Sequence, residues 1–576
     1  MAGLAGTDTI SFRDDPVALE EVLAGHDLVR SRSDVAARYQ TLYESAMKHF
    51  SAMKEVNKFG RHDWRSVFGE TFRVFAELWE YLKENMVSLR HSGLLQSYRT
   101  ADVASKIGQM FYHSYVLSSD VEYLHQAYWF YSAVRYSSSS TDTDTSELHS
   151  SHLLLMRMRY LARFLSVALL LGRSRVLSEL VEKLEKQVTI YNTLYPGSQD
   201  ASDWHNTAVE ARSMLEALEL VQVPSRDMLL EHRLVLTPHY VRAAGSLSLD
   251  EAILVSCTHR QARFSQLTLD MLRMVYTLEL QTTDRHAPPH VKFEQAGLPP
   301  RVVGHDRRPV VNPRKCLLHR PSVPELLAEL SIIMKDVSPN GITLLYFSCN
   351  STRSFDRSSN APSTPTRSRD VGHPPVGLSL RSTAGNSSAP EDNLYPSDLT
   401  VFTRKPLFLI IDSDQTSTFE AVKSPFHQPF VSLLAASRLP EDFSDYQLNG
   451  RLLTLFLTCP LTAFCHVCNL VDVTESLWTA ACRAMTAAAS TILDCLRASS
   501  QLDADLCLFL DDFFTRTLVC RFVFCQVVFR HHYAFPSTQY WPTSCPPIPG
   551  ELLSTERLHL ALMSVADSLD VRQLFE

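Results

Sequence analysis

Apolar residues in the N-terminal third of the chain recur every three or four positions, from about residue 34 to 222. The stretch "HDWRSVFGETFRVFAELWEYL" places five aromatic residues on one helix face: Trp64, Phe68, Phe72, Phe75 and Trp79. Helix pairs follow, with turns at residues 118–120 and at Gly172. The pattern resembles a tetratricopeptide-type (TPR-like) stack without its regular repeat. It predicts an irregular helical-hairpin domain, residues 34–222, after a flexible N-terminus, residues 1–33.

The pattern changes after Pro224, where short apolar runs alternate with amphipathic helices such as "SQLTLDMLRMVYTLEL" and "VPELLAELSIIMKDV". The predicted strands are "RLVLT", "EAILVSC", "GITLLYFS", "PLFLIID", "PFVSLLA" and "RLLTLFL". Continuous apolar strands between helices favour a mostly parallel sheet that is covered on both faces. Residues 223–576 are therefore predicted to form a three-layer α/β domain, with two or three long helices from Val473 onward. The expected fold class is α/β plus all-α.

Two segments interrupt this second domain. Residues 287–321 are rich in proline and basic residues, and residues 350–393 contain too few large apolar side chains to fold alone. The second segment is predicted to be a disordered surface insertion. Its serines and threonines beside arginines suit a phosphorylated docking loop, and a tolerated insertion without function explains them equally well.

One uncharged run of residues raises the question of whether the chain spans a membrane. Residues 452–471, "LLTLFLTCPLTAFCHVCNLV", carry no formal charge over a length that could cross a bilayer. The run contains three threonines, and Pro460 divides it into halves of strand length. A buried strand followed by a second buried element is the favoured interpretation, and no membrane association is expected.

Composition narrows the classes of function. The net charge of -8 over 576 residues, without a dominant charged block, argues against a dedicated nucleic-acid-binding protein. The start, "MAGLAGTDTISFRDDP", has no secretory signal pattern, so the 12 cysteines are expected to stay reduced. No glycine-rich phosphate-binding motif is present.

The segment "RKPLFLIIDSDQT" raises the question of catalysis, because an apolar strand followed by D-x-D-x-T begins phosphohydrolases of the haloacid dehalogenase type. Asp412 and Asp414 would then be nucleophile and acid/base. Thr458 would contact phosphate, and Asp511 and Asp512 would complete a magnesium site. No lysine follows Lys423, however, and residues 506–528 have the spacing of one helix, with Asp512 and Arg516 as an exposed pair.

Two other interpretations of this loop remain. Asp412, Asp414 and Thr416 partly match the Asp-x-Ser-x-Ser magnesium loop of von Willebrand A-like domains, without identifiable distant ligands. Alternatively, the polar residues only end a buried strand, and Ser417 or Thr418 caps the following helix. The second interpretation is favoured, and Asp412, Asp414 and Thr416 remain the weaker metal candidates.

Two further signals are weak. Cys465-His-Val-Cys468 lacks a partner pair at zinc-site spacing, so buried thiols are favoured over zinc or redox chemistry. The basic loop offers Arg307, Arg308, Arg314 and Lys315 as a nuclear-import or partner-binding patch, and a solvated loop is an equal alternative.

Several stretches together resemble the SCAI (suppressor of cancer cell invasion) family. They are "FGRHDWRSVFGETFRVFAELW", "ASKIGQMFYHSYVLSSDVEYLHQAYWFYSAVR", "RFSQLTLDMLRMVYTLE", "FTRKPLFLIIDS" and "SLDVRQLF". The resemblance runs from about Gln40 to the end, except for residues 350–393. Asp414 departs from the serine-rich sequence expected after Asp412, which weakens the D-x-D-x-T interpretation. The chain also lacks the basic N-terminal extension of longer relatives, so the loop at residues 307–315 is the better import candidate.

The resemblance implies a transcriptional corepressor that binds other proteins and is not an enzyme. Such a protein would restrain myocardin-related and serum response factor transcription downstream of Rho signalling, and so limit cell migration. It would reside in the nucleus, with a cytoplasmic fraction, and would use no cofactor, small-molecule substrate or sequence-specific DNA contact. The competing hypothesis is a magnesium-binding α/β domain or phosphohydrolase centred on Asp412.

Overall fold

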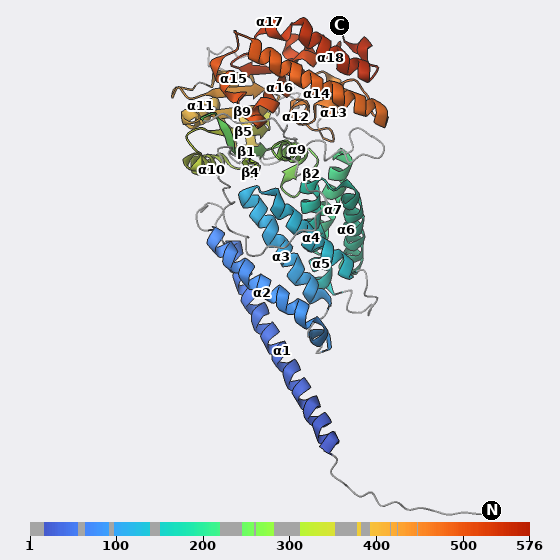
Figure 1. The fold of residues 1–576 in the computed structure, drawn as a ribbon. Helices are drawn as coiled ribbons and strands as arrows, with labels where there is room; N and C mark the ends of the chain where they lie inside the picture. Colours follow the sequence, from blue (N-terminus) through green and yellow to red (C-terminus); the bar gives the residue numbers. More distant parts are fainter. Residues whose placement is uncertain are drawn as a thin grey trace, which may run out of the picture. The chain divides into compact units, whose positions relative to one another are not determined.

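The structure is a computed structural model. It describes residues 16–55, 64–91, 97–138, 150–218, 245–258, 261–280, 311–351, 377–381 and 392–575, apart from Gln415, Lys423 and Tyr446. Side chains of the first helix are described from residue 34. Figure 1 labels the elements along the chain.

Four helices begin the chain: α1 (Pro16–Glu55), α2 (Trp64–His91), α3 (Ser97–Ser118) and α4 (Val121–Ser138). Helices α1 and α2 pack along each other (Figure 1), and the rings of Phe50 and Phe75 lie 6.0 Å apart between them. Phe68, Phe72 and Phe75 are buried, as the aromatic stripe predicts. Helix α1 begins at Pro16, within the range 1–33 that was predicted as a flexible N-terminus.

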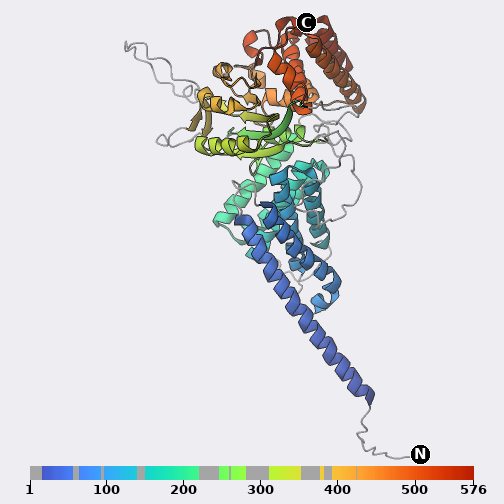
Figure 2. The ribbon, with the colours of Figure 1, turned by 60° about the vertical axis from the view of Figure 1, so that its left-hand side comes forward.

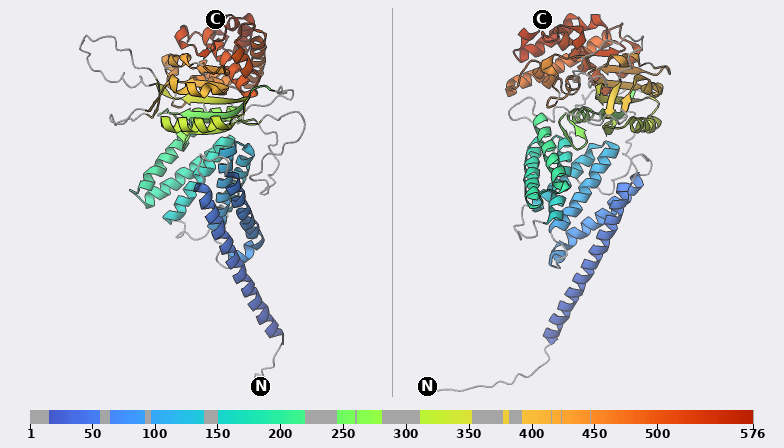
Figure 3. Two further views of the ribbon diagram at one scale, coloured as in Figure 1. Left: turned by 90° about the vertical axis from the view of Figure 1, so that its left-hand side faces the viewer. Right: turned by 180° about the vertical axis from the view of Figure 1, so that it is seen from behind.

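Three more helices form consecutive hairpins: α5 (Ser151–Leu171), α6 (Ser174–Leu194) and α7 (Gln199–Leu218). They lie side by side in both views of Figure 3. Gly172 ends α5 in the left-handed conformation, with φ of 66°, and its N–H donates to the carbonyl of Leu169 at 2.9 Å. A side chain with a Cβ would be strained there, so the glycine makes the tight reversal into α6 possible.

A six-stranded sheet has the order β11-β10-β9-β5-β1-β4. Its strands are β1 (Ser248–Ser256), β4 (Arg314–His319), β5 (Gly341–Ser348), β9 (Leu407–Asp412), β10 (Phe430–Leu434) and β11 (Thr543–Cys545). All neighbours are parallel except β10 and β11. The predicted mostly parallel sheet is confirmed.

Helices cover both faces of this sheet (Figure 2). Leu326, Leu330 and Ile333 of α10 (Val323–Asp336) are buried against one face. The helices α9 (Leu269–Thr277), α12 (Leu452–Thr458) and α16 (Phe513–His531) cover the other, and α14 (Glu475–Ala498) and α18 (Glu556–Ser568) pack on α16. The predicted layers and long C-terminal helices are therefore present.

The remaining elements are short. They are β2 (Arg263–Phe264), β3 (Leu267–Thr268), β6 (Asn350–Ser351), β7 (Leu378–Arg381), β8 (Asp392–Leu394), α11 (Pro396–Thr400), α13 (Pro460–Val467), α15 (Ala504–Phe509), α17 (Gly550–Leu553) and five 3-10 helices (Val401–Arg404, Ser417–Ala421, Glu441–Phe443, Thr538–Tyr540, Arg572–Leu574). Strands β6, β7 and β8 form a small antiparallel sheet. Of the predicted insertion, residues 350–393, the structure describes residues 350–351, 377–381 and 392–393, and all of these except Gly377 lie in the three strands.

The chain divides into two compact units at different places from the predicted boundary after residue 222. Of the described residues, those up to Met110 and those from Trp129 to Ser138 form one unit, and the others form the second. Helices α5, α6 and α7 thus belong with the sheet. Arg263 of β2 pairs with Glu210 of α7 at 2.6 Å, a contact that helical periodicity alone does not predict.

Two predicted elements are wrong, and each has a physical reason. "RLLTLFL" is the helix α12, because a uniformly apolar run has no period that separates a strand from a helix. No helix among the described ranges is both long enough and apolar enough to cross a bilayer. The helix predicted over residues 506–528 is broken into α15 and α16, because Asp512 caps α16 and is buried rather than exposed beside Arg516.

Substitution of Asp512 tests its role as the N-cap that separates α16 from α15. Its Oδ1 accepts hydrogen bonds from the backbone N–H groups of Phe514 and Thr515 at 2.9 and 3.0 Å, and its Oδ2 accepts from Leu249 at 3.1 Å. We expect Asp512→Ala to lower the free energy of unfolding by about 1–2 kcal/mol, the usual loss for an N-cap. Urea denaturation measures it, with the exposed neighbour Asp511→Ala as control. Equal losses in the two variants would contradict the capping role.

Candidate functional site: the carboxyl edge of the sheet

In the sheet, β4 lies on one side of β1, and the next strand along the chain, β5, lies on the other side of β1. The strand order therefore reverses between β1 and β5. Parallel α/β sheets bind ligands at the carboxyl ends of the strands at such a point. Ser256, Ser348 and Asp412 stand in one row across the ends of β1, β5 and β9. The carboxyl edge of the sheet near β1 and β5 is therefore the candidate functional site.

Asp412, the last residue of β9, is 3% exposed. Its Oδ2 accepts hydrogen bonds from both the backbone N–H and the hydroxyl of Thr454, each at 2.8 Å. The Tyr346 hydroxyl lies 2.7 Å from the Thr454 hydroxyl, which already donates to Asp412, so Tyr346 is the donor of this second bond. Asp412 thus holds the first turn of α12 against the sheet.

A second carboxylate, Asp270 of α9, is completely buried at the same edge. Its Oδ2 accepts from Gln261 Nε2 at 2.6 Å and from the Ser348 hydroxyl at 2.9 Å. Its Oδ1 accepts from the backbone N–H of Arg451 at 3.2 Å. Asp270 therefore joins the end of β5 to the start of α12.

Two guanidinium groups balance these carboxylates. Arg451 Nη2 donates to the Cys349 carbonyl at 2.8 Å and to Asn350 Oδ1 at 2.5 Å. Arg273 Nη1 donates to the Asn449 carbonyl at 2.6 Å. Gly450 lies between these groups with φ of 73°, and a Cβ there would come within 2.5 Å of both Arg273 and Asp270. The chain's own residues therefore fill the end of the β1–β5 crevice.

Burial sets the charge state of Asp412. Burial and the charge of Asp270 raise the pKa of this carboxyl to about 6, against the opposing effects of Arg451 and of the hydrogen bonds from Thr454. In the unfolded chain the carboxyl has its ordinary pKa of about 4. The folded state therefore binds this proton more tightly than the unfolded state does.

We expect the Asp412 contribution to stability to be present below pH 4 and to be lost as the pH rises through about 6. A raised carboxyl pKa favours the folded state only while the group is protonated, and two units correspond to about 3 kcal/mol. Asp412→Asn keeps an acceptor for Thr454 without the charge. The free energy of unfolding, measured in urea from pH 4 to 8, should rise in Asp412→Asn relative to wild type as the pH increases. A constant difference would contradict this origin.

The other residues of the predicted D-x-D-x-T loop have structural partners. Asp414 accepts from the backbone N–H of Ser351 at 2.6 Å and from its hydroxyl at 3.1 Å. Thr416 donates to the Ala435 carbonyl at 2.7 Å. The predicted cap at Ser417 or Thr418 is wrong, because a 3-10 helix already begins at Ser417, with Thr416 at its N-cap position.

The residues that the phosphohydrolase hypothesis requires do not come together. The Thr458 hydroxyl donates within α12 to the Thr454 carbonyl at 2.7 Å. Asp512 bonds to Leu249 at the amino end of β1, whereas Asp412 ends the parallel strand β9 at the opposite edge. Among the residues that the structure describes, no three His, Cys, Asp or Glu side chains converge to hold a metal ion.

Cys465 and Cys468, at and just beyond α13, are free and buried. Burial raises the pKa of the Cys465 thiol to about 12 and also raises that of Cys468. Both therefore remain protonated thiols at neutral pH.

The last two residues of the predicted import or partner patch lie in a strand rather than a loop, because β4 spans Arg314–His319. Arg314 pairs with the buried Glu251, and Lys315, 8% exposed, pairs with Glu279. The Lys315 side chain is 3% exposed, whereas that of Arg314 is 40% exposed. Arg307 and Arg308 lie outside the described residues.

Sequence reasoning missed Asp270, Arg273, Arg451, Thr454 and Tyr346. One signal was available in "LTLDMLRMVYTL", where an aspartate and an arginine interrupt an otherwise apolar helix. Buried charges need partners, so such a pair predicts a buried polar network. The partners in residues 449–454 are far away in sequence and are known only from the fold.

Together these features define a class: a helical and α/β protein whose own side chains occupy the ligand-binding edge of its sheet. The family model described as Protein SCAI matches residues 41–535, and the chain belongs to this family. Human Protein SCAI is 30% identical over 97% of this chain and 93% of its own length. Mouse Protein SCAI is 30% identical over 96% of this chain and 91% of its own length. The Dictyostelium discoideum Protein SCAI homolog is 24% identical over 94% of this chain and 91% of its own length. No solved structure matches.

Proposed function

We propose that the chain is a transcriptional corepressor that acts by binding other proteins. It would restrain transcription by myocardin-related coactivators and serum response factor downstream of Rho signalling, and so limit cell migration. Membership of the SCAI family along nearly the whole chain carries this proposal. The protein would act in the nucleus, with a cytoplasmic fraction, and would use no cofactor.

The chemistry of the sheet edge supports a role other than catalysis. Asp412, Asp270, Arg273 and Arg451 are all buried, and each already bonds to groups of the chain itself. A catalytic carboxylate needs access to a substrate, and these side chains would have to give up protein partners to gain it. The stacked helices provide the extended surfaces on which helical-repeat proteins bind partners.

Expression of the full chain should lower the output of a reporter driven by serum response elements in cells with activated Rho. Tagged chain should also recover a myocardin-related coactivator from nuclear extract. A reporter with mutated response elements controls for general effects on transcription. An unchanged reporter, together with no coactivator recovered where a known cofactor recovers it, would contradict the proposal.

A further inference from the structure

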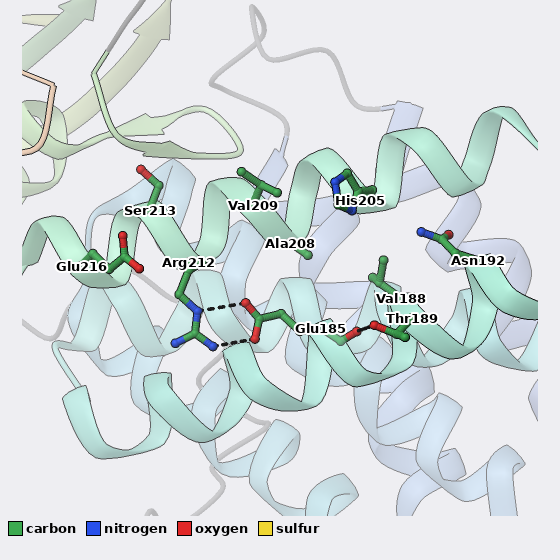
Figure 4. Close-up of a pocket in the computed structure, with 10 residues that line it drawn as sticks. All are labelled: Glu185, Val188, Thr189, Asn192, His205, Ala208, Val209, Arg212, Ser213 and Glu216. Carbon is green, nitrogen blue, oxygen red and sulfur yellow. Dashed lines mark hydrogen bonds and ion pairs between the residues drawn. The ribbon is translucent and has the colours of Figure 1, made fainter.

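A groove lies between the antiparallel helices α6 and α7 (Figure 4). It has a volume of about 330 Å³, which is within the usual range for binding pockets. Val188, Ala208 and Val209 provide its apolar part. The α7 residues buried along these helices are mostly alanines, at positions 201, 208, 211 and 217, and their small side chains leave room between the helices.

The rim of the groove is acidic. Glu185 of α6 and Arg212 of α7 form a bidentate ion pair across it, with N–O distances of 2.9 and 2.5 Å (Figure 4). The pKa of Arg212 is raised by its hydrogen bonds to Glu185 and by the charges of Glu185, Glu216 and Glu182. Three carboxylates therefore lie close to one guanidinium, and Glu182 and Glu216 are exposed.

One apolar residue of the groove is open to solvent. Val209 is 54% exposed, whereas Val188 and Ala208 are buried at its base. From Glu185 to Asn192 the lining residues of α6 span seven positions, about 10 Å or two helical turns. This length suits the apolar face of a short helix laid into a groove.

We propose that the α6–α7 groove binds a basic amphipathic helix of a partner protein. Aliphatic side chains of that helix would contact Val209, above the buried Val188 and Ala208, and its lysines or arginines would face Glu182 and Glu216. Charge complementarity of this kind selects the partner and speeds association. The inference rests on the proposed function, because it takes protein binding to be the activity, and it adds where and what the protein binds.

The direct test is fluorescence anisotropy with the full chain and a synthetic helical peptide of about 16 residues, with leucines on one face and lysines beside them. Wild type should bind this peptide, and the groove variant Val209→Asp/Glu216→Lys should bind it about 10-fold more weakly or worse. A matched control, Leu560→Asp/Asp203→Lys, changes equally exposed residues outside the groove and should bind as wild type does. Thermal melting checks that all three chains are folded.

A second peptide with glutamates in place of the lysines should not bind. Equal affinity of wild type and groove variant, or equal affinity for the two peptides, would overturn the proposal.

The serum response reporter separates this inference from the proposed function. We expect the control variant to repress the reporter and the groove variant to lose repression. Full repression by the groove variant would overturn the groove as the binding surface of the corepressor, whereas an inactive wild-type chain would contradict the proposed function instead.

Discussion

Lys315→Met should lower the free energy of unfolding by about 3–5 kcal/mol, because it removes the buried ammonium group that lies beside the Glu279 carboxylate. Lys315 Nζ lies 3.3 Å from Glu279 Oε1, and the two side chains are 3% and 0% exposed. Glu279 Oε1 also accepts from the Tyr115 hydroxyl at 2.5 Å. Urea denaturation of the full chain measures the effect.

An exposed ion pair of similar chemistry is the control. Arg572 and Asp567 lie 3.0 Å apart with side chains 65% and 50% exposed, so Arg572→Met should cost less than about 1 kcal/mol. The double variant Glu279→Leu/Lys315→Met removes both buried charges and should recover much of the stability. Similar costs for Lys315→Met and Arg572→Met would contradict the account of this pair.

Arg451→Met should cost a similar amount, about 3–5 kcal/mol, at neutral pH. The guanidinium bonds to Cys349 and Asn350 at the end of β5, and its charge opposes the rise in the pKa of Asp412. Its loss leaves Asp270 and Asp412 in one buried site with less positive charge. The pKa of Asp412 should rise further, so the variant should lose stability over a higher pH range than wild type does.

A double-mutant cycle with Asp412→Asn isolates the electrostatic part of this effect. Asp412→Asn removes one of the two carboxylates, so Arg451→Met should cost less in that background. Unfolding in urea at pH 7.5 supplies the four free energies. Additive costs would show that Arg451 acts only through its bonds to β5, against our account of the site.

Much of the fold could be predicted from local patterns. Strands β1, β5, β9 and β10 are continuous apolar runs bounded by polar residues, and the helices from α2 to α7 repeat at helical spacing. Helix α12 was missed because "LLTLFL" contains no polar position to show a period, and its start is stabilised by a distant residue, Asp412. The grouping of α5, α6 and α7 with the sheet depends on packing between segments that are far apart in sequence. The spacing of apolar residues within a helix does not predict such packing.

The candidate site at Asp412 was interpreted from one strand only. Asp412 does end a buried strand at the ligand-binding edge, yet its partner Thr454 comes from a segment predicted as another strand. The partner of Lys315 could not be predicted either. Lys315 lies in a proline-rich basic segment of the sequence, and its buried partner Glu279 is identified only by the fold. Both errors concern partners that only the folded chain brings together.

We propose that the chain represses transcription by binding proteins and that Asp412 stabilises the fold. Asp412→Asn tests it most directly in the serum response reporter, with thermal melting to confirm folding. Our account predicts that the folded variant represses the reporter as strongly as wild type, because the asparagine keeps the acceptor for Thr454. Loss of repression in a folded Asp412→Asn chain would contradict the account and point to chemistry at this carboxylate.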